Sequence, residues 1–291
     1  MKDGMIRATA AGGSLRLFVA DATQTVNEAF HIHQTSPVVT AALGRLLTAA
    51  AMMGAMLKNE TDIVTLTVKG NGPLGGVMVT SDSLSRVKGY PFNPRVDIPL
   101  KPNGKLDVSG AVGVGVLQVA KDVGLKEPYT GQIELVSGEI AEDLAQYFAL
   151  SEQTPTAVAL GVLVDVDYQV KQAGGYMVQA LPGASDDTLA ALEGRLAKLP
   201  PVTQLMEEGR SPQDILALIT EGMDCVVNDT IPIGYYCNCN RDRVEKALVS
   251  LGRKELEMIL AEDKLATLHC HFCNTDYHFD EAQLRAILEP V

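Results

Sequence analysis

The chain has 291 residues, of which 46% are hydrophobic and 21% charged, so it is long enough to bury more than one small core. Its formal net charge of −12 argues against a nucleic-acid partner, because phosphate binding needs a basic surface. No apolar stretch of signal-peptide length precedes the first charges, and we therefore expect a cytoplasmic protein with no membrane partner.

Residues 1–180 predict an α+β core domain with a mixed or antiparallel sheet. Apolar side chains recur at every second position in several segments, and short glycine-rich turns join some of these, which favours antiparallel pairing over a doubly wound sheet. A helix is expected at Ile140–Leu150, and strands at Leu15–Asp21, Ile63–Lys69, Val77–Thr80, Val114–Ala120, Gln132–Val136 and Val162–Val170.

A long apolar helix is predicted from Val38 to Leu57. Ser36 is its expected N-cap, and Pro37 stands at its first position. A membrane span over these residues would place Arg45 in the hydrocarbon, at about 2.5–3.5 kcal/mol on insertion scales. We therefore predict a helix that is buried in the protein core.

Two patterns in this domain are similar to functional motifs but lack their context. Gly70 to Gly75 matches G-x-G-x-x-G, yet strand-like residues follow where a dinucleotide-binding motif must open a helix, so a β-turn is predicted. His31 and His33 have no third ligand candidate nearby, which predicts a structural or surface role. No catalytic pattern stands in the first 230 residues, and we do not expect an enzyme.

Residues 181–230 are predicted to form an acidic helical linker. Between Gly183 and Thr230, nine Asp or Glu stand against three Lys or Arg, a net of −6. Ser185 and Ser211 are helix-start signals. We expect helices with a weak core and mutual repulsion, and hence a linker of marginal stability.

Residues 231–291 carry four cysteines in two close pairs, Cys237 with Cys239 and Cys270 with Cys273. Four thiolates at this spacing are typical of a tetrahedral zinc site, and the same sulfurs can leave the metal as disulfides. A closed set of four ligands leaves no position for water, so one structural Zn²⁺ per chain is predicted. Helices expected at 241–252, 253–262 and 281–288, with strands around 267–269 and 277–279, make this a small α+β zinc module.

The other polar residues of this region receive lesser roles. Cys225 stands alone and is predicted to be a bystander. Three histidines are predicted to tune the site or lie on the surface, and three basic residues to offset the negative charge of the thiolates. The histidines are His269, His271 and His278, and the basic residues are Arg241, Arg243 and Lys246.

The predicted metal matters because the module is small. A structural zinc ion contributes about 10–16 kcal/mol, which is comparable with the roughly 5–15 kcal/mol that stabilises a whole domain. The packing of a module of about 60 residues cannot readily replace that contribution. Oxidation of the thiols is therefore expected to eject the ion and unfold the module, which makes it a redox switch.

Motifs in a matching order run along almost the whole chain. They are His33, Ser36-Pro37, Leu43-Gly44-Arg45, Gly72-Pro73, Gly89-Tyr90, Ser137-Gly138-Glu139, Ser151-Glu152-Gln153, Tyr236-Cys237-Asn238-Cys239, Arg241, Arg243, Val244, Leu248, Leu251-Gly252, Cys270-His271-Phe272-Cys273, Tyr277 and Phe279. In order and spacing they resemble the redox-regulated thirty-three-kilodalton heat-shock chaperone family. His271 departs from that pattern, because many relatives carry an acidic residue there, and this departure puts the oxidation threshold in doubt.

The resemblance implies a holdase chaperone of the stress response that is inactive when reduced and zinc-bound. In the family, oxidation releases zinc, forms disulfides within each cysteine pair, unfolds the module and linker, and exposes a surface that captures unfolding client proteins. Oxidised chains also form homodimers. Carried over to this chain, the zinc ligands and redox-active thiols are Cys237, Cys239, Cys270 and Cys273. Each such disulfide closes a very short loop and supplies only roughly 2 kcal/mol, far less than the metal.

Two other classes of function stay open. A thiol-disulfide oxidoreductase needs an exposed cysteine of low pKa, usually at the start of a helix, whereas Cys270 to Cys273 follow a predicted strand. A zinc-ribbon interaction module is the other alternative, and the acidic charge disfavours nucleic acid as its partner.

Overall fold

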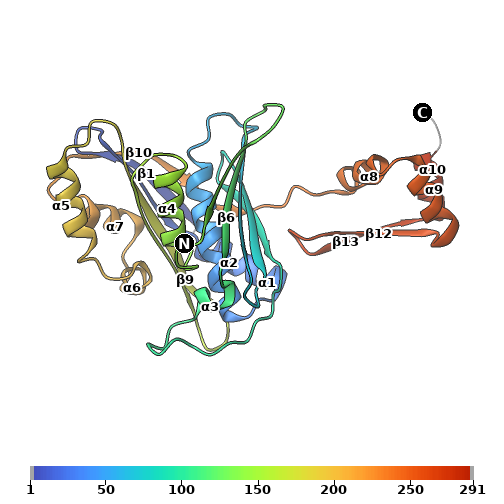
Figure 1. Ribbon diagram of the computed structural model, residues 1–291, viewed down its shortest axis with the longest axis horizontal. Helices are drawn as coiled ribbons and strands as arrows, with labels where there is room; N and C mark the ends of the chain where they lie inside the picture. The colour runs from blue at the N-terminus through green and yellow to red at the C-terminus, as the bar shows by residue number, and fades with distance from the viewer. Residues whose placement is uncertain (1–2, 289–291) are drawn as a thin grey trace. The chain divides into compact units, whose positions relative to one another are not determined.

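The computed structural model describes residues 3–288. These divide into two compact units, Met1–Tyr236 and Cys237–Val291. Helices and antiparallel strands alternate irregularly along both units, as Figure 1 shows, and the predicted α+β class is confirmed.

One sheet of the first unit has five strands, and all neighbouring pairs in it are antiparallel. The sheet joins distant parts of the chain, because β1 near the N-terminus pairs with β10. In spatial order the strands are β10 (Cys225–Pro232), β1 (Gly4–Ala10), β2 (Leu15–Asp21), β9 (Val170–Ala180) and β8 (Thr156–Val164).

The other sheet has six strands, of which only the short edge strand β11 pairs in parallel, with β5. The remaining neighbours are antiparallel, as predicted. In spatial order the strands are β11 (Gly234–Tyr235), β5 (Arg86–Pro91), β4 (Gly76–Asp82), β3 (Ile63–Gly70), β6 (Gly115–Asp122) and β7 (Tyr129–Glu134).

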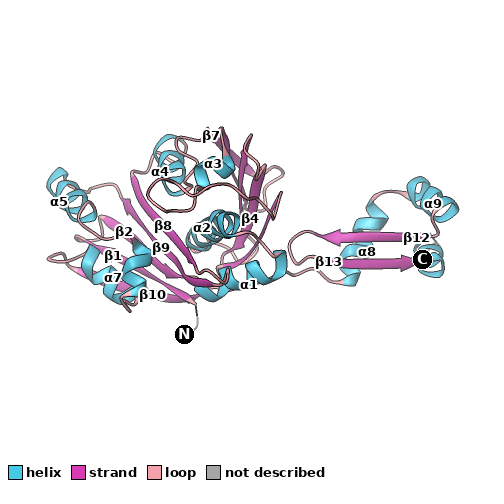
Figure 2. Ribbon diagram, turned by 90° about the horizontal axis from the view of Figure 1, so that it is seen from below, coloured by secondary structure: helices cyan, strands magenta, loops and turns pink. Residues whose placement is uncertain are grey.

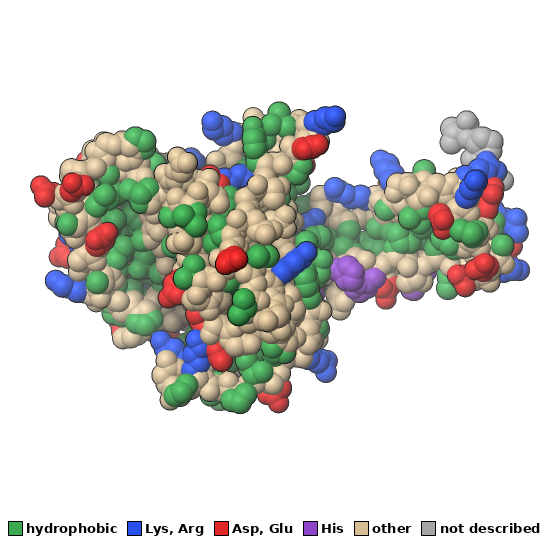
Figure 3. Space-filling model, viewed as in Figure 1, with side chains coloured by type: hydrophobic (Ala, Val, Ile, Leu, Met, Phe, Trp, Pro, Cys, Tyr) green, Lys and Arg blue, Asp and Glu red, His purple; other side chains and the backbone are tan. Residues whose placement is uncertain are grey.

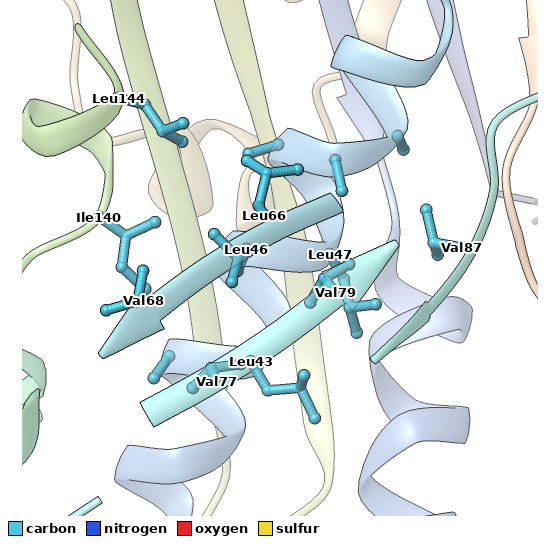
Figure 4. Packing of buried hydrophobic residues seen from close by; sticks show 14 of the residues in the cluster. Leu43, Leu46, Leu47, Leu66, Val68, Val77, Val79, Val87, Ile140 and Leu144 are labelled. Carbon is cyan, nitrogen blue, oxygen red and sulfur yellow. The ribbon is translucent and has the colours of Figure 1, made fainter. Parts of the chain in front are cut away.

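Helix α2 (Pro37–Gly54) lies between the two sheets, as Figure 2 shows end-on. It is the one helix among the described residues that is long and apolar enough to cross a membrane, and 89% of it is buried in the protein. Its side chains Leu43, Leu46 and Leu47 point towards strands β3 and β4 of the six-stranded sheet (Figure 4). The prediction of a buried helix that begins after Ser36 is confirmed.

Two glycines let α2 approach its neighbours closely. A Cβ atom at Gly44 would lie 2.5 Å from a methyl group of Val26 and 2.8 Å from one of Val162. At Gly54 it would lie 2.4 Å from the backbone oxygen of Asp82. Real Cβ contacts are longer than this, so close packing of the helix depends on both glycines.

Three further helices complete the first 180 residues: α1 (Thr23–His33), α3 (Val108–Val112) and α4 (Ala141–Leu150). At the end of α1, His33 Nε2 lies 2.8 Å from the carbonyl oxygen of Gly89 and 3.2 Å from the hydroxyl of Tyr235. His33 therefore has the predicted structural role, while His31 is exposed on the surface.

Helices α6 (Val202–Glu207) and α7 (Pro212–Ile219) pack on the outer face of the five-stranded sheet, and α5 (Asp186–Leu196) packs against α7 (Figure 1). Ser185 and Ser211 cap α5 and α7 as predicted. The expected weak core is wrong for α6 and α7, which bury Leu205, Met206, Ile215, Leu216 and Ile219. The helix propensity and charge of this segment do not reveal that its apolar side chains pack on a face of the five-stranded sheet.

The boundary between the two units also differs from the predicted one. Residues 181–230 and the following strand segments belong to the first unit, which ends at Tyr236. The role of residues 181–230 as a linker concerns their stability on oxidation and stays a prediction.

The strand predicted at Val162–Val170 covers the end of β8, a hairpin turn and the first residue of β9. Strand β8 ends at Val164 and β9 begins at Val170. Between them, Tyr168 N donates to Asp165 O at 2.9 Å, and Tyr168 has a positive φ of 68°. Apolar residues continue to alternate through this turn, so periodicity alone runs the two strands together. The turn predicted at Gly70 to Gly75 is confirmed between β3 and β4.

The second unit is a small α+β fold with one hairpin. The helices are α8 (Arg241–Ser250), α9 (Arg253–Glu262) and α10 (Glu281–Leu288), and the strands are β12 (Leu265–Cys270) and β13 (Thr275–Asp280), close to the predicted elements. Its core holds only five fully buried apolar residues among the described ones: Leu248, Leu256, Ala266, Phe279 and Leu284.

Candidate metal centre

The four paired cysteines of the second unit meet at one point. Their Sγ atoms all lie within 4.8 Å of one another. Cys237 Sγ lies 3.7 Å from Cys270 Sγ, and Cys239 Sγ lies 3.1 Å from Cys273 Sγ. The structure therefore brings together all four predicted ligands, from segments that are more than 30 residues apart.

Local structure explains why each pair can present two sulfurs to one point. Cys237 and Cys239 stand on the extended segment that leads into α8, whose N-cap Asn240 accepts a hydrogen bond from Arg243 N. Cys270 ends β12, and Asn274 N donates to its carbonyl oxygen at 2.8 Å across a tight turn. This turn holds Cys273 beside Cys270, so the second pair lies at a chain turn and the first pair on an extended segment.

The arrangement fits a tetrahedral metal site. A zinc–sulfur bond is about 2.3 Å, so the sulfurs of a tetrahedral site are roughly 3.8 Å apart. The 3.7 Å and 3.1 Å contacts, within a cluster no wider than 4.8 Å, are close to that spacing. Thiolates are the donors that zinc and other thiophilic ions prefer, so these four residues can hold a metal ion.

Tyr277 extends the site beyond the four sulfurs. Its hydroxyl group lies 3.1 Å from Cys239 Sγ, while Cys273 Sγ donates to Thr275 Oγ1 at 3.3 Å. Sequence reasoning named Tyr277 only as part of a motif and gave it no role at the sulfurs. The available signal was strand periodicity, because residues 275, 277 and 279 share one face of β13.

The thiols differ in how easily they ionise. Burial raises the pKa of Cys237 and of Cys273. Burial acts in the same direction on Cys239, but hydrogen bonds from Tyr277, Cys273, Cys237 and Cys270 outweigh it and lower the pKa of Cys239 to about 7. The hydrogen bond to Cys239 raises the pKa of Tyr277 to about 12, so the phenol stays protonated and can donate to the sulfur.

In the part of the chain that the structure describes, Arg241 and Cys225, two residues near the four cysteines in the sequence, do not contact the sulfur cluster directly. Arg241 donates to the carbonyl oxygen of His278 and to Gln283, and its guanidinium lies 4.4 Å above the ring of Phe279. Its direct partners are thus the strand and helix beside the site rather than the sulfurs, whose charge it was predicted to offset. Cys225 is an exposed residue at the start of β10 in the first unit and does not belong to the cluster.

Comparisons with known proteins agree over almost the entire chain. The family model described as "Hsp33 protein" matches residues 3–280. A "33 kDa chaperonin" of Clostridioides difficile (strain 630) is 50% identical over 290 residues, which cover 99% of this chain and 99% of that protein. A protein of the same name from Ruminiclostridium cellulolyticum is 50% identical over 289 residues, again covering 99% of both.

A solved structure shows that the likeness includes the fold. The crystal structure of the 33 kDa chaperonin (heat shock protein 33 homolog) from Thermotoga maritima matches this chain with a TM-score of 0.92 at 40% sequence identity. The match covers 99% of this chain and 98% of that one. Because the family model matches residues 3–280 and relatives are 50% identical over 99% of the chain, the chain belongs to the Hsp33 family.

Proposed function

We propose that this chain is a cytoplasmic, redox-regulated holdase chaperone. When reduced, Cys237, Cys239, Cys270 and Cys273 hold one Zn²⁺ and the protein is inactive. When the four thiols are oxidised, the second unit unfolds and the protein binds unfolding client proteins. The relatives are named chaperonins, which supports the chaperone part of the proposal.

The observation that carries the regulatory part is the position of the sulfur cluster in a unit with a small hydrophobic core. Five buried apolar residues are few for a fold of this size. Bound zinc supplies about 10–16 kcal/mol of apparent stability, which a core this small cannot replace. The redox state of the four cysteines therefore decides whether the second unit is folded.

The chemistry of the switch belongs to the sulfurs. Two thiols form a disulfide by losing two electrons and two protons, and one molecule of peroxide takes these up to give two molecules of water. Two disulfides, proposed within the pairs Cys237–Cys239 and Cys270–Cys273, consume all four ligands. Disulfide sulfurs are poor donors to zinc, so the ion leaves, and two short loops return only roughly 2 kcal/mol each.

Residues 181–230 are proposed to loosen together with the second unit. Their net charge of −6 makes them self-repelling, and Leu192 is the only residue of α5 that is fully covered. If α5, α6 and α7 leave the five-stranded sheet, apolar side chains such as Leu17, Val19 and Tyr176 lose their cover. A bared apolar sheet face is the kind of surface that binds unfolding chains.

Homodimer formation is proposed for the oxidised state. Strand β8 stands at the end of its sheet, and none of its nine residues is charged. An uncharged edge strand offers a row of backbone groups to a second strand, which supports pairing with another copy of the chain.

The proposal is tested by measuring client aggregation by light scattering, before and after peroxide, while a chromophoric chelator reports released zinc. We expect suppression of aggregation only after oxidation, with one zinc released per chain. A Cys225→Ser variant serves as the control and is expected to behave like the unchanged chain. Equal suppression in both states with zinc retained would contradict the switch, and peptide mapping would show whether disulfides form within the pairs.

A thiol-disulfide oxidoreductase is the second candidate, and the lowered pKa of Cys239 favours it. Fully reduced protein would then reduce insulin disulfides without prior oxidation. Activity of that kind, abolished by Cys239→Ser, would favour the enzyme over the chaperone.

A further inference from the structure

The hairpin of the second unit has an exposed polar face, opposite the face that carries Cys270. Ala266, Leu268 and Cys270 turn to the inner face of β12, while Thr267 and His269 are exposed on the other. The paired strand β13 continues this exposed face with alternate residues 276, 278 and 280. Figure 3 shows histidine side chains, in purple, gathered on the surface of this unit.

His269 and His271 lie side by side on this face. They flank Cys270, with His269 near the end of β12 and His271 at the start of the turn that follows it, and both side chains are exposed. Their ring centroids are 5.0 Å apart, with the rings at 69° to each other. The third histidine of the face, His278, is held by a 2.9 Å contact between its Nδ1 and Thr267 Oγ1.

The carboxylate of Asp276 prepares His269 for a metal ion. His269 pairs directly with Asp276 across the hairpin, and its Nδ1 lies 2.7 Å from Asp276 Oδ1. An ionised carboxylate only accepts hydrogen bonds, so Nδ1 carries the proton and Nε2 presents its lone pair. Metal-binding histidines almost always donate their other nitrogen to a carboxylate or carbonyl in this way.

We propose that His269 and His271 bind a second metal ion, distinct from the one held by the four cysteines. Two nitrogens that share an ion with bonds of about 2.1 Å are at most about 4.2 Å apart. Ring centroids 5.0 Å apart are close enough for one ion to bond to a nitrogen of each ring. Waters complete the coordination, because both histidines are exposed, His269 by 37% of its side chain.

The ligand chemistry selects the class of ion. Imidazole suits Cu²⁺, Ni²⁺ and Zn²⁺, whereas the hard ions Mg²⁺ and Ca²⁺ need oxygen ligands. Among these three, the general order of affinity places Cu²⁺ first. The site is therefore one for borderline divalent transition ions, and it stands next to a redox-sensitive thiol.

The test uses Ni²⁺, which binds imidazole and does not oxidise thiols as Cu²⁺ does. Full-length, tag-free, reduced and zinc-loaded protein is titrated with NiCl₂ by isothermal calorimetry in a non-chelating buffer, and zinc retention is measured by elemental analysis. We expect one Ni²⁺ per chain in addition to the retained zinc. His269→Ala and His271→Ala should each weaken binding at least 10-fold, and Asp276→Asn by about 10-fold.

His278→Ala is the matched control, because it removes an imidazole from the same face without touching the proposed ligands, and its affinity should stay within about twofold. Unchanged zinc content and unfolding temperature show that each variant is folded. The proposal is overturned if Ni²⁺ displaces zinc, if either ligand variant binds like the unchanged chain, or if His278→Ala weakens binding as much as they do. None of these results depends on chaperone activity.

Discussion

At the scale of single residues, one carboxylate joins two parts of the first unit. Glu139, in the loop before α4, accepts hydrogen bonds from Arg45 Nη1 of α2 at 2.6 Å and from Lys101 Nζ at 2.5 Å. Burial raises the pKa of Glu139, but the hydrogen bonds and charges of Lys101 and Arg45 outweigh it and lower the pKa to about 2. The ionised form therefore stabilises the fold.

We expect Glu139→Gln to lower the free energy of unfolding at pH 7 by about 1–3 kcal/mol, since it removes the carboxylate partner of Arg45 and leaves Lys101 with Asp107 alone. A carboxylate whose pKa is depressed on folding stabilises fully above its ordinary pKa of 4.5, and this stabilisation is lost as the pH falls towards about 2. The difference between the variant and the unchanged chain should shrink over that range in thermal unfolding followed by circular dichroism. Glu127→Gln, at an exposed loop position, is the control and should show no such pH-dependent difference.

Tyr277 gives a second prediction at this scale. Its hydroxyl touches Cys239 Sγ, and hydrogen bonds to ligand atoms orient them and tune their affinity for the metal. Tyr277→Phe should weaken zinc binding about 10-fold, measured by competition with a chelator of known affinity. Tyr129→Phe, at an exposed position of the first unit, should leave zinc binding as it is. Equal affinities of the two variants would mean that the hydroxyl does not act on the site.

At the scale of elements, alanine substitutions at Gly54 of α2 and Gly194 of α5 are predicted to change stability in opposite directions, because only Gly54 is closely packed. Gly54→Ala forces a Cβ atom against the backbone of Asp82 and should destabilise the first unit by about 1–3 kcal/mol. Gly194 of α5 has open space around its Cβ direction, so Gly194→Ala should stabilise by about 0.5–1 kcal/mol through helix propensity. Urea unfolding curves distinguish the two signs, and a stable Gly54→Ala variant would show that α2 has room to shift.

The contrast between α2, which the sequence predicts, and the turn between β8 and β9, which it does not, shows what hydrophobic periodicity can predict. The cap at Ser36 and a run of apolar residues define α2 because both signals are local. The turn after Val164 has no glycine or proline, and its apolar residues keep alternating, so only the hydrogen bonds of the folded chain reveal it. Strand β10 is almost wholly exposed along its length, and its pairing with β1 is fixed by tertiary contacts rather than by its own pattern.

At the scale of the whole molecule, the division into two units predicts a selective response to metal removal. Chelation of zinc from the reduced chain should raise backbone amide exchange throughout residues 237–288, because their core is small, while α2 and its sheets remain protected. Hydrogen exchange followed by mass spectrometry measures both regions in one sample. Readdition of zinc under reducing conditions should restore protection, and protection that never changes would show that the second unit stands without its metal.

The cluster of four cysteines could be predicted from the sequence much better than its surroundings. Cysteine spacing carries the chemistry of a thiolate site directly, and the structure places all four sulfurs together. The hydroxyl of Tyr277 and the partners of Arg241 depend on side-chain directions that spacing does not encode. For the same reason, residues 181–230 seemed weakly cored, since the sheet that receives their apolar side chains is formed by distant segments.

The pairing of β10 with β1 also has a consequence for synthesis of the chain. Strand β1 leaves the ribosome long before its outer neighbour β10, which ends only at Pro232. Until then one edge of the five-stranded sheet stays open, because a contact so distant in sequence forms late. The five-stranded sheet is therefore completed only as Cys237 emerges, so the first unit can fold before the four-cysteine cluster forms.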